Sequence, residues 1–191
     1  MIQFDEKTHT YTLDGTELPS VTTICRFLAY DYKSDRPCLA EAAARRGTAI
    51  HEACALIDYG EEPEETPEIA GYLTAYRRFL KDYSPEWRGI ERPLGDLRLG
   101  FAGTPDRWGT MGGERVLVDI KSGSTLRMPA LSAQLLGYKA LLEGAAFHPS
   151  AFYGLRLDKS GVYELRQVEP DFRLFSACLT IHRTITKRGY R

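Results

Sequence analysis

The spacing of apolar residues predicts several helices along the chain. Between residues 67 and 83 apolar side chains recur every three or four positions, which places them on one face of a helix. Thr66 is a favoured capping residue just before this segment, and Pro67 suits the first helical position. Similar patterns predict helices over residues 20–30, 38–59 and 129–143, and a C-terminal helix over residues 169–188.

Short apolar runs between these helices predict strands. The dipeptide Asp14-Gly15 is a strong turn signal and predicts a hairpin formed by residues 2–13 and 16–19. Further strands are expected over residues 86–94, 97–104, 115–121, 150–157 and 162–168. The core order is helix, three strands, helix and strand. We therefore expect an α/β (α+β) fold with a central mixed β-sheet flanked by helices.

The length of the chain fits one domain, since 191 residues lie within the usual range of about 100–200 residues. We expect the hairpin and first helix (1–37), the core (38–168) and the C-terminal helix (169–188) to form a single unit, 1–191. No apolar run approaches the ~20 residues that cross a bilayer. The first six residues also lack the basic start and apolar core of a signal peptide. A cytoplasmic protein without membrane contact is expected.

The net charge of the chain limits the kinds of partner that we expect it to bind. A net charge of -1 argues against a protein that coats nucleic acid through bulk electrostatics. It leaves open a local site, because basic groups can gather around one cleft while acids such as the five in residues 61–68 lie elsewhere. Six basic residues lie next to the candidate motifs described below and are candidates for such a cleft: Arg45, Arg46, Arg98, Arg107, Arg127 and Lys139.

Two charges interrupt the apolar run of residues 116–121. Asp119 and Lys121 share one face of the predicted strand, whereas Ile120 points to the other. A buried carboxylate stays ionised most cheaply beside a cation, and Asp106 offers a second acid thirteen residues upstream. This combination suits a hard divalent ion with a lysine that acts on water or phosphate. The alternative is a solvated ion pair at the end of a strand.

Other segments supply further candidates. His51 lies on the predicted helix 38–59, and its imidazole could complete a nitrogen and oxygen ligand set for Mg²⁺ or Mn²⁺. Gln134 and Tyr138 are four residues apart and share one face of the next predicted helix. Glu91 lies one predicted strand before Asp106 and could act as an outer-shell or second-metal group. Each of these residues also has an ordinary explanation when taken singly. His51 could be a packing histidine, Gln134 and Tyr138 could lie on an ordinary helix edge, and Glu91 could face solvent.

In order along the chain, these segments resemble the motifs of the PD-(D/E)XK nucleases, and most closely the RecB-type and phage recombination exonucleases. The resemblance extends over most of the chain, because the opening residues 18–24 also look like the start of phage members. No single motif is specific for the family, but the five motifs in this order are. The matching segments are Gly47-Thr48-Ala49-Ile50-His51, Glu91, Gly103-Thr104-Pro105-Asp106, Asp119-Ile120-Lys121 and Gln134-Leu135-Leu136-Gly137-Tyr138.

The resemblance implies a role for each matching residue. The metal ligands would be His51, Asp106, Asp119 and the carbonyl of Ile120, with Lys121 as the catalytic lysine. Glu91 would join the catalytic set, although Glu86 or Asp96 could be aligned in its place. The resemblance implies that Gln134 and Tyr138 lie near the active centre and the DNA strand. Arg45 and Arg107 are expected to contact DNA because they lie next to the motifs.

The resemblance also implies a restriction-endonuclease-like core and hydrolysis of DNA with one or two Mg²⁺ or Mn²⁺ ions. No iron–sulfur cluster is expected, since the four cysteines lack the closely spaced C-terminal trio of one branch of the family. DNA is the implied partner, with a single-strand annealing or recombination protein as a second one. We expect an exonuclease on linear DNA. An endonuclease of the same fold, a catalytically inactive DNA-binding module and a different Mg²⁺-dependent phosphoryl-transfer enzyme remain the alternatives.

Overall fold

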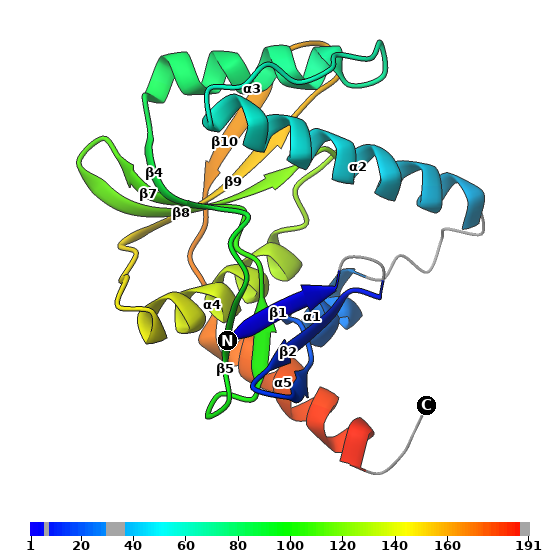
Figure 1. Cartoon of the computed structure of the whole chain (residues 1–191), viewed down its shortest axis with the longest axis vertical. Coiled ribbons are helices and arrows are strands. Elements are labelled where there is room, and N and C mark those ends of the chain that lie inside the picture. The colour runs from blue at the N-terminus through cyan, green and yellow to red at the C-terminus, as the bar shows by residue number, and fades with distance from the viewer. Residues whose placement is uncertain (6–7, 30–36, 188–191) are drawn as a thin grey trace.

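The structure is a computed structural model that describes residues 1–5, 8–29 and 37–187. Its centre is a mixed five-stranded sheet with the strand order β10-β9-β8-β7-β4 (Figure 1). Strands β8 and β9 run parallel, and the other neighbours are antiparallel. The strands of this sheet are β4 (Glu86–Ile90), β7 (Arg107–Met111), β8 (Glu114–Lys121), β9 (Ala151–Leu157) and β10 (Tyr163–Gln167).

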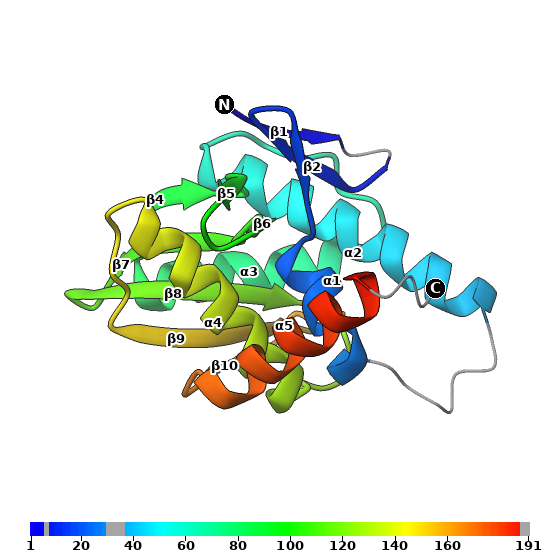
Figure 2. The same ribbon diagram turned by 90° about the horizontal axis from the view of Figure 1, so that it is seen from below.

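Helices cover both faces of the sheet, as expected. Two of them, α2 (Pro37–Asp58) and α3 (Ala70–Tyr83), pack on one face against side chains that include Val118 and Ile120. The other face, which bears Leu117, is covered by α4 (Met128–Gly144), with α1 (Val21–Ala29) and α5 (Phe172–Lys187) packed against that helix (Figure 2). The apolar runs in the strands are thus buried by helices on both sides, which confirms an α+β fold with a mixed central sheet.

Two small sheets lie outside the central one. The first joins β1 (Ile2–Asp5), β2 (Thr10–Leu13) and β3 (Thr16–Leu18), so the first arm of the predicted hairpin is two strands. Its turn is at Asp14 and Gly15, with φ of 49° and 82°, as the dipeptide predicts. The second pairs β5 (Leu94–Asp96) with β6 (Phe101–Gly103).

The strands before the site differ most from the prediction. The expected strand 86–94 ends at Ile90, and the expected strand 97–104 is reduced to β6, outside the central sheet. Its place beside β8 is taken by β7, which the apolar pattern of the sequence does not predict. Two glycines in β4 and β7 obscured this pairing because they interrupt the apolar pattern. Both are required by close packing: a Cβ on Gly109 would lie 2.0 Å from the carbonyl oxygen of Glu86, and one on Gly89 would overlap the Trp108 indole.

Helix ends also differ in detail. Helix α3 begins at Ala70, and Thr66 contributes only its backbone carbonyl, which accepts hydrogen bonds from the N–H groups of Ile69 and Ala70. The prediction that Pro67 opens this helix is therefore wrong. Helix α5 begins at Phe172, whose side chain is exposed rather than packed. The predicted last residues of two helices, Tyr30 and residue 188, lie outside the described residues.

Candidate metal centre

His51, Glu91 and Asp106 meet between α2 and the central sheet. Their ligand atoms lie within 4.8 Å of one another, although 55 residues separate the first from the last. His51 Nδ1 is 3.1 Å from Glu91 Oε1 and 3.7 Å from Asp106 Oδ1. One imidazole nitrogen and two carboxylates form a donor set suited to a hard or borderline divalent cation. The arrangement could therefore bind a metal ion.

The main chain of β8 adds a fourth group. The carbonyl oxygen of Ile120 lies 3.2 Å from His51 Nε2, and the N–H of Ile120 donates to Asp106 Oδ2 at 2.6 Å. This brings together three of the four predicted ligands: His51, Asp106 and the Ile120 carbonyl. The acidic side chain that the structure places beside them is Glu91, whereas Glu86 is exposed at the start of β4 and Asp96 pairs with Arg98.

Asp119 and Lys121 form an ion pair beside this group. Asp119 is fully buried and its Oδ2 lies 2.7 Å from Lys121 Nζ, while its Oδ1 has no hydrogen-bond partner among the described residues. Burial raises the pKa of Asp119 to about 6, although Lys121 opposes the shift. A buried carboxylate oxygen without a donor is an available ligand atom. This supports the predicted role of Asp119, although it is not one of the three mutually closest groups.

A chain of side chains from α4 reaches the lysine. Gln134 Oε1 lies 3.4 Å from Lys121 Nζ, and Gln134 Nε2 donates to the Tyr138 hydroxyl at 3.1 Å. Tyr138 is only 4 % exposed, so its predicted contact with DNA is wrong. Its ring is packed because Gly103 lies directly against it, where a Cβ would come within 2.8 Å of Tyr138 Cε1. Tyr138 instead orients Gln134, which faces Lys121.

Tyr138→Phe tests this chain. The substitution removes the hydroxyl that Gln134 donates to, and leaves the packed ring in place. We expect the melting temperature to change little. The DNA cleavage that the sequence motifs lead us to expect should fall about tenfold, since a misplaced side chain costs rate through lost orientation. Steady-state cleavage rates with wild-type protein as reference measure the effect. A wild-type rate would show that Gln134 is held without the tyrosine.

The two arginines predicted to bind DNA differ. Arg45 lies exposed on α2 and pairs with Glu41 at 3.0 Å, so it remains a candidate for DNA contact. Arg107 is fully buried in β7, where it bonds to Asp58 and Glu91. The prediction for Arg107 is therefore wrong. It treated this residue as part of a loop because the strand was not recognised.

Two residues at the site were missed from the sequence. Asp58, the last residue of α2, accepts hydrogen bonds from Tyr76, Trp87 and Arg107. Tyr11 of β2 bonds through its hydroxyl to Thr104 at 2.8 Å, which ties the N-terminal sheet to the loop before Asp106. An acid at a helix end is common, and a tyrosine in a hairpin is ordinary. No local signal in the sequence distinguishes these two residues.

The acidic residues around His51 determine the protonation state of its imidazole. Burial lowers the pKa of His51, but the charges of Asp106 and Glu91 outweigh it and raise the pKa to about 9. Burial likewise lowers the pKa of Lys121, but Asp119 and Asp106 raise it above its ordinary value. Both side chains are therefore cationic at neutral pH. A metal ion would have to displace the His51 proton to bind its nitrogen.

Metal-induced stabilisation should therefore depend on pH. A raised histidine pKa stabilises the metal-free fold below pH ~6.5, and this contribution is lost as the pH rises towards about 9. Metal affinity should rise over the same interval, by up to about tenfold per pH unit, because one proton leaves His51. We expect the shift in melting temperature caused by Mn²⁺ to grow between pH ~6.5 and ~8.5. His51→Gln should make this shift small and independent of pH. An unchanged pH dependence in this variant would contradict the assignment.

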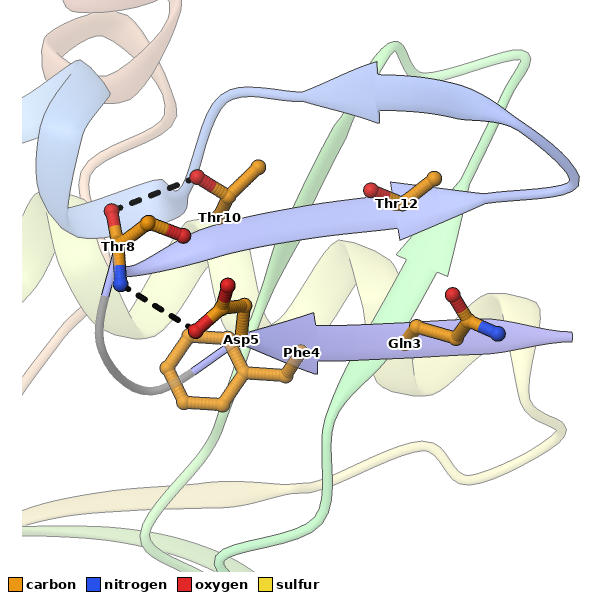
Figure 3. Close-up of a pocket in the computed structure, with 6 residues that line it drawn as sticks. All are labelled: Gln3, Phe4, Asp5, Thr8, Thr10 and Thr12. Atoms are coloured by element: carbon orange, nitrogen blue, oxygen red, sulfur yellow. Dashed lines mark hydrogen bonds between the residues drawn. The ribbon is translucent and has the colours of Figure 1, made fainter.

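Hollows on the surface of the described residues include one beside the site and one on the N-terminal sheet. The first, of about 270 Å³, is lined by Lys121, Gly123, Thr125, Leu126, Arg127, Ala130, Leu131 and Gln134. The other, of about 400 Å³, lies on the polar face of β1 and β2, lined by Gln3, Asp5, Thr8, Thr10 and Thr12 with Phe4 (Figure 3). The second is larger but contains a single carboxylate. Only the first is next to reactive groups.

A comparison with protein-family models gives no match for this chain, and neither does a comparison with curated proteins. Among the described residues, no helix has both the length and the apolar character needed to cross a membrane.

Proposed function

We propose that the protein is a divalent-metal-dependent nuclease of the PD-(D/E)XK type that hydrolyses phosphodiester bonds of DNA. The observation that carries this proposal is the position of Lys121, which pairs with Asp119 on one strand, beside the cluster of His51, Glu91 and Asp106. The order of elements from α2 through β4, β7, β8 and α4 to β9 agrees with a restriction-endonuclease-like core.

The metal centre would use His51, Glu91, Asp106, Asp119 and the carbonyl of Ile120. A bound Mg²⁺ or Mn²⁺ would supply Lewis-acid chemistry, polarising a phosphate oxygen and acidifying water. The oxygen-rich donor set fits both ions, with the imidazole favouring Mn²⁺ over Mg²⁺. The buried Asp119 Oδ1, which no described donor satisfies, supports the fit.

Lys121 would act mainly through its charge. Asp119 and Asp106 keep its ammonium protonated against the effect of burial, so the group offers hydrogens and positive charge rather than a lone pair. In this role it orients the attacking water and stabilises negative charge that develops on the phosphate. Gln134 accepts from the same ammonium and limits its rotation. A site of this kind would leave 5'-phosphate and 3'-hydroxyl ends.

We further propose an exonuclease on linear DNA that acts in recombination or repair, with a single-strand annealing or recombination protein as partner. The test compares linear and covalently closed circular DNA of one sequence with Mg²⁺, with Mn²⁺ and with chelator. We expect metal-dependent loss of the linear form and survival of the circle. Equal degradation of the circle would indicate an endonuclease. DNA that survives Mn²⁺ at high protein concentration would indicate an inactive binding module.

A further inference from the structure

Arg107 is a fully buried cation that connects two ligands of the candidate metal centre. Its Nη1 donates to Glu91 Oε1 at 2.9 Å and to the Asp106 carbonyl at 2.7 Å. Its Nε donates to Asp58 Oδ2 at 2.5 Å. Different edges of one guanidinium therefore bind the metal centre and Asp58, which is an arrangement that requires the planar fork of arginine.

Asp58 balances the charge of this arginine. Its carboxylate is 1 % exposed and also accepts from the Tyr76 hydroxyl at 2.6 Å and from Trp87 Nε1 at 3.1 Å. The donors come from α3, β4 and β7, so three elements hold one carboxylate at the end of α2. Buried ion pairs contribute little net stability compared with apolar packing. The pair of Arg107 and Asp58 is therefore better explained by a role at the neighbouring metal centre than by a role in folding.

Glu91 needs an external constraint. It lies just beyond the end of β4 with φ of 44°, in the left-handed region that non-glycine residues seldom adopt. Its N–H donates to the Asp106 carbonyl at 2.9 Å, the same oxygen that accepts from Arg107 Nη1. Strained residues of this kind persist where the surroundings determine them, and they cluster at functional sites. Arg107 fixes both the carboxylate and the carbonyl that anchors its backbone.

We propose that Arg107, charge-balanced by Asp58, is a positioning residue that holds Glu91 beside His51 and Asp106 as a metal ligand. The proposal deepens the proposed function, because it concerns the same metal centre. Its test is metal binding, which can be measured whether or not the protein cleaves DNA.

The test uses Mn²⁺ affinity, measured by titration of the free-ion electron paramagnetic resonance signal. Arg107→Met alone would leave the Asp58 charge unpaired, so the decisive variant is Arg107→Met with Asp58→Asn, which removes both charges. We expect this double variant to bind Mn²⁺ about 10- to 100-fold more weakly, as is typical when an outer-shell partner of a ligand is lost. Arg78→Met, which removes a hydrogen bond from α3 to Gly161, is the matched control and should keep wild-type affinity.

A mutant cycle with Glu91→Gln separates positioning from a general structural effect. Because Arg107 is proposed to act through Glu91, the double substitution should have no further effect on Mn²⁺ affinity once Glu91 is glutamine. An equal loss in both backgrounds, or wild-type affinity in the double variant, would overturn the proposal.

A second variant tests the proposal if the double variant folds poorly. Arg107→Lys keeps the charge opposite Asp58 but cannot reproduce the fork, so weaker Mn²⁺ binding is again expected, and wild-type affinity would overturn the proposal. Mn²⁺ binding that depends on Arg107 without DNA cleavage would refute the nuclease and leave this inference standing. DNA cleavage together with an Mn²⁺ affinity that does not depend on Arg107 would support the nuclease and refute this inference.

Discussion

Lys121→Met is expected to reduce DNA cleavage by a factor of about 10³ or more while the protein stays folded. The substitution keeps the aliphatic stem and removes the ammonium that faces Asp119 and Gln134. A positioned charged group of this kind typically contributes 10²- to 10⁴-fold to the rate. Single-turnover cleavage of linear DNA at saturating Mg²⁺ measures the loss, and circular dichroism reports the fold.

Lys81→Met is the matched control for this variant. Lys81 is exposed in the last turn of α3 and is not among the candidate residues of the basic cleft, so the same chemical change there should leave the cleavage rate within about twofold. A wild-type rate for Lys121→Met would remove the lysine from the mechanism. Equal losses for both variants would mean that positive charge in general, rather than this position, matters.

Asp106→Asn is expected to abolish metal binding and cleavage together. An asparagine can keep its carbonyl oxygen on the Ile120 N–H, now accepted by Asp106 Oδ2, but its amide group would replace the oxygen nearest His51. An amide nitrogen donates hydrogen bonds and does not ligate Mg²⁺ or Mn²⁺. We expect a loss of at least about 100-fold in Mn²⁺ affinity, with cleavage below detection.

The control for this variant is Asp158→Asn, in the turn after β9, where the carboxylate binds Ser160 and Arg156 and is not part of the cluster. It should leave both metal affinity and cleavage unchanged. Isothermal titration with Mn²⁺ and a cleavage assay on the same samples give the two readouts. Full Mn²⁺ affinity in Asp106→Asn would place the metal elsewhere.

The alternation of charge and apolar residues in β8 made the centre of the site predictable. Strand geometry separates Asp119 and Lys121 from Ile120, and the structure confirms this: Ile120 packs towards α2 and α3, and the two charges pair with each other. Helical spacing likewise predicted that Gln134 and Tyr138 share a face, and they are hydrogen-bonded. These inferences succeeded because they depend on local periodicity.

The parts that were missed depend on contacts between distant segments. Gly109 interrupts the apolar pattern of strand β7. The neighbouring strand β4, which is distant in sequence, leaves no room for a side chain at this position. Because β7 was missed, Arg107 was assigned to the DNA surface and its partner Asp58, 49 residues earlier, was overlooked. The left-handed conformation of Glu91 is likewise set by Asp106 and Arg107, so nothing in the sequence around residue 91 reports it.

The central claim is that α2, the end of β4 and the segments around β7 and β8 converge on one divalent cation. A crystal soaked in Mn²⁺ near pH 8, with diffraction recorded at the manganese absorption edge, tests it most directly. The account predicts an anomalous peak within bonding distance of His51, Glu91 and Asp106, and no such peak in Asp106→Asn. An ordered site without a peak, or a peak bound only by other residues, would contradict it.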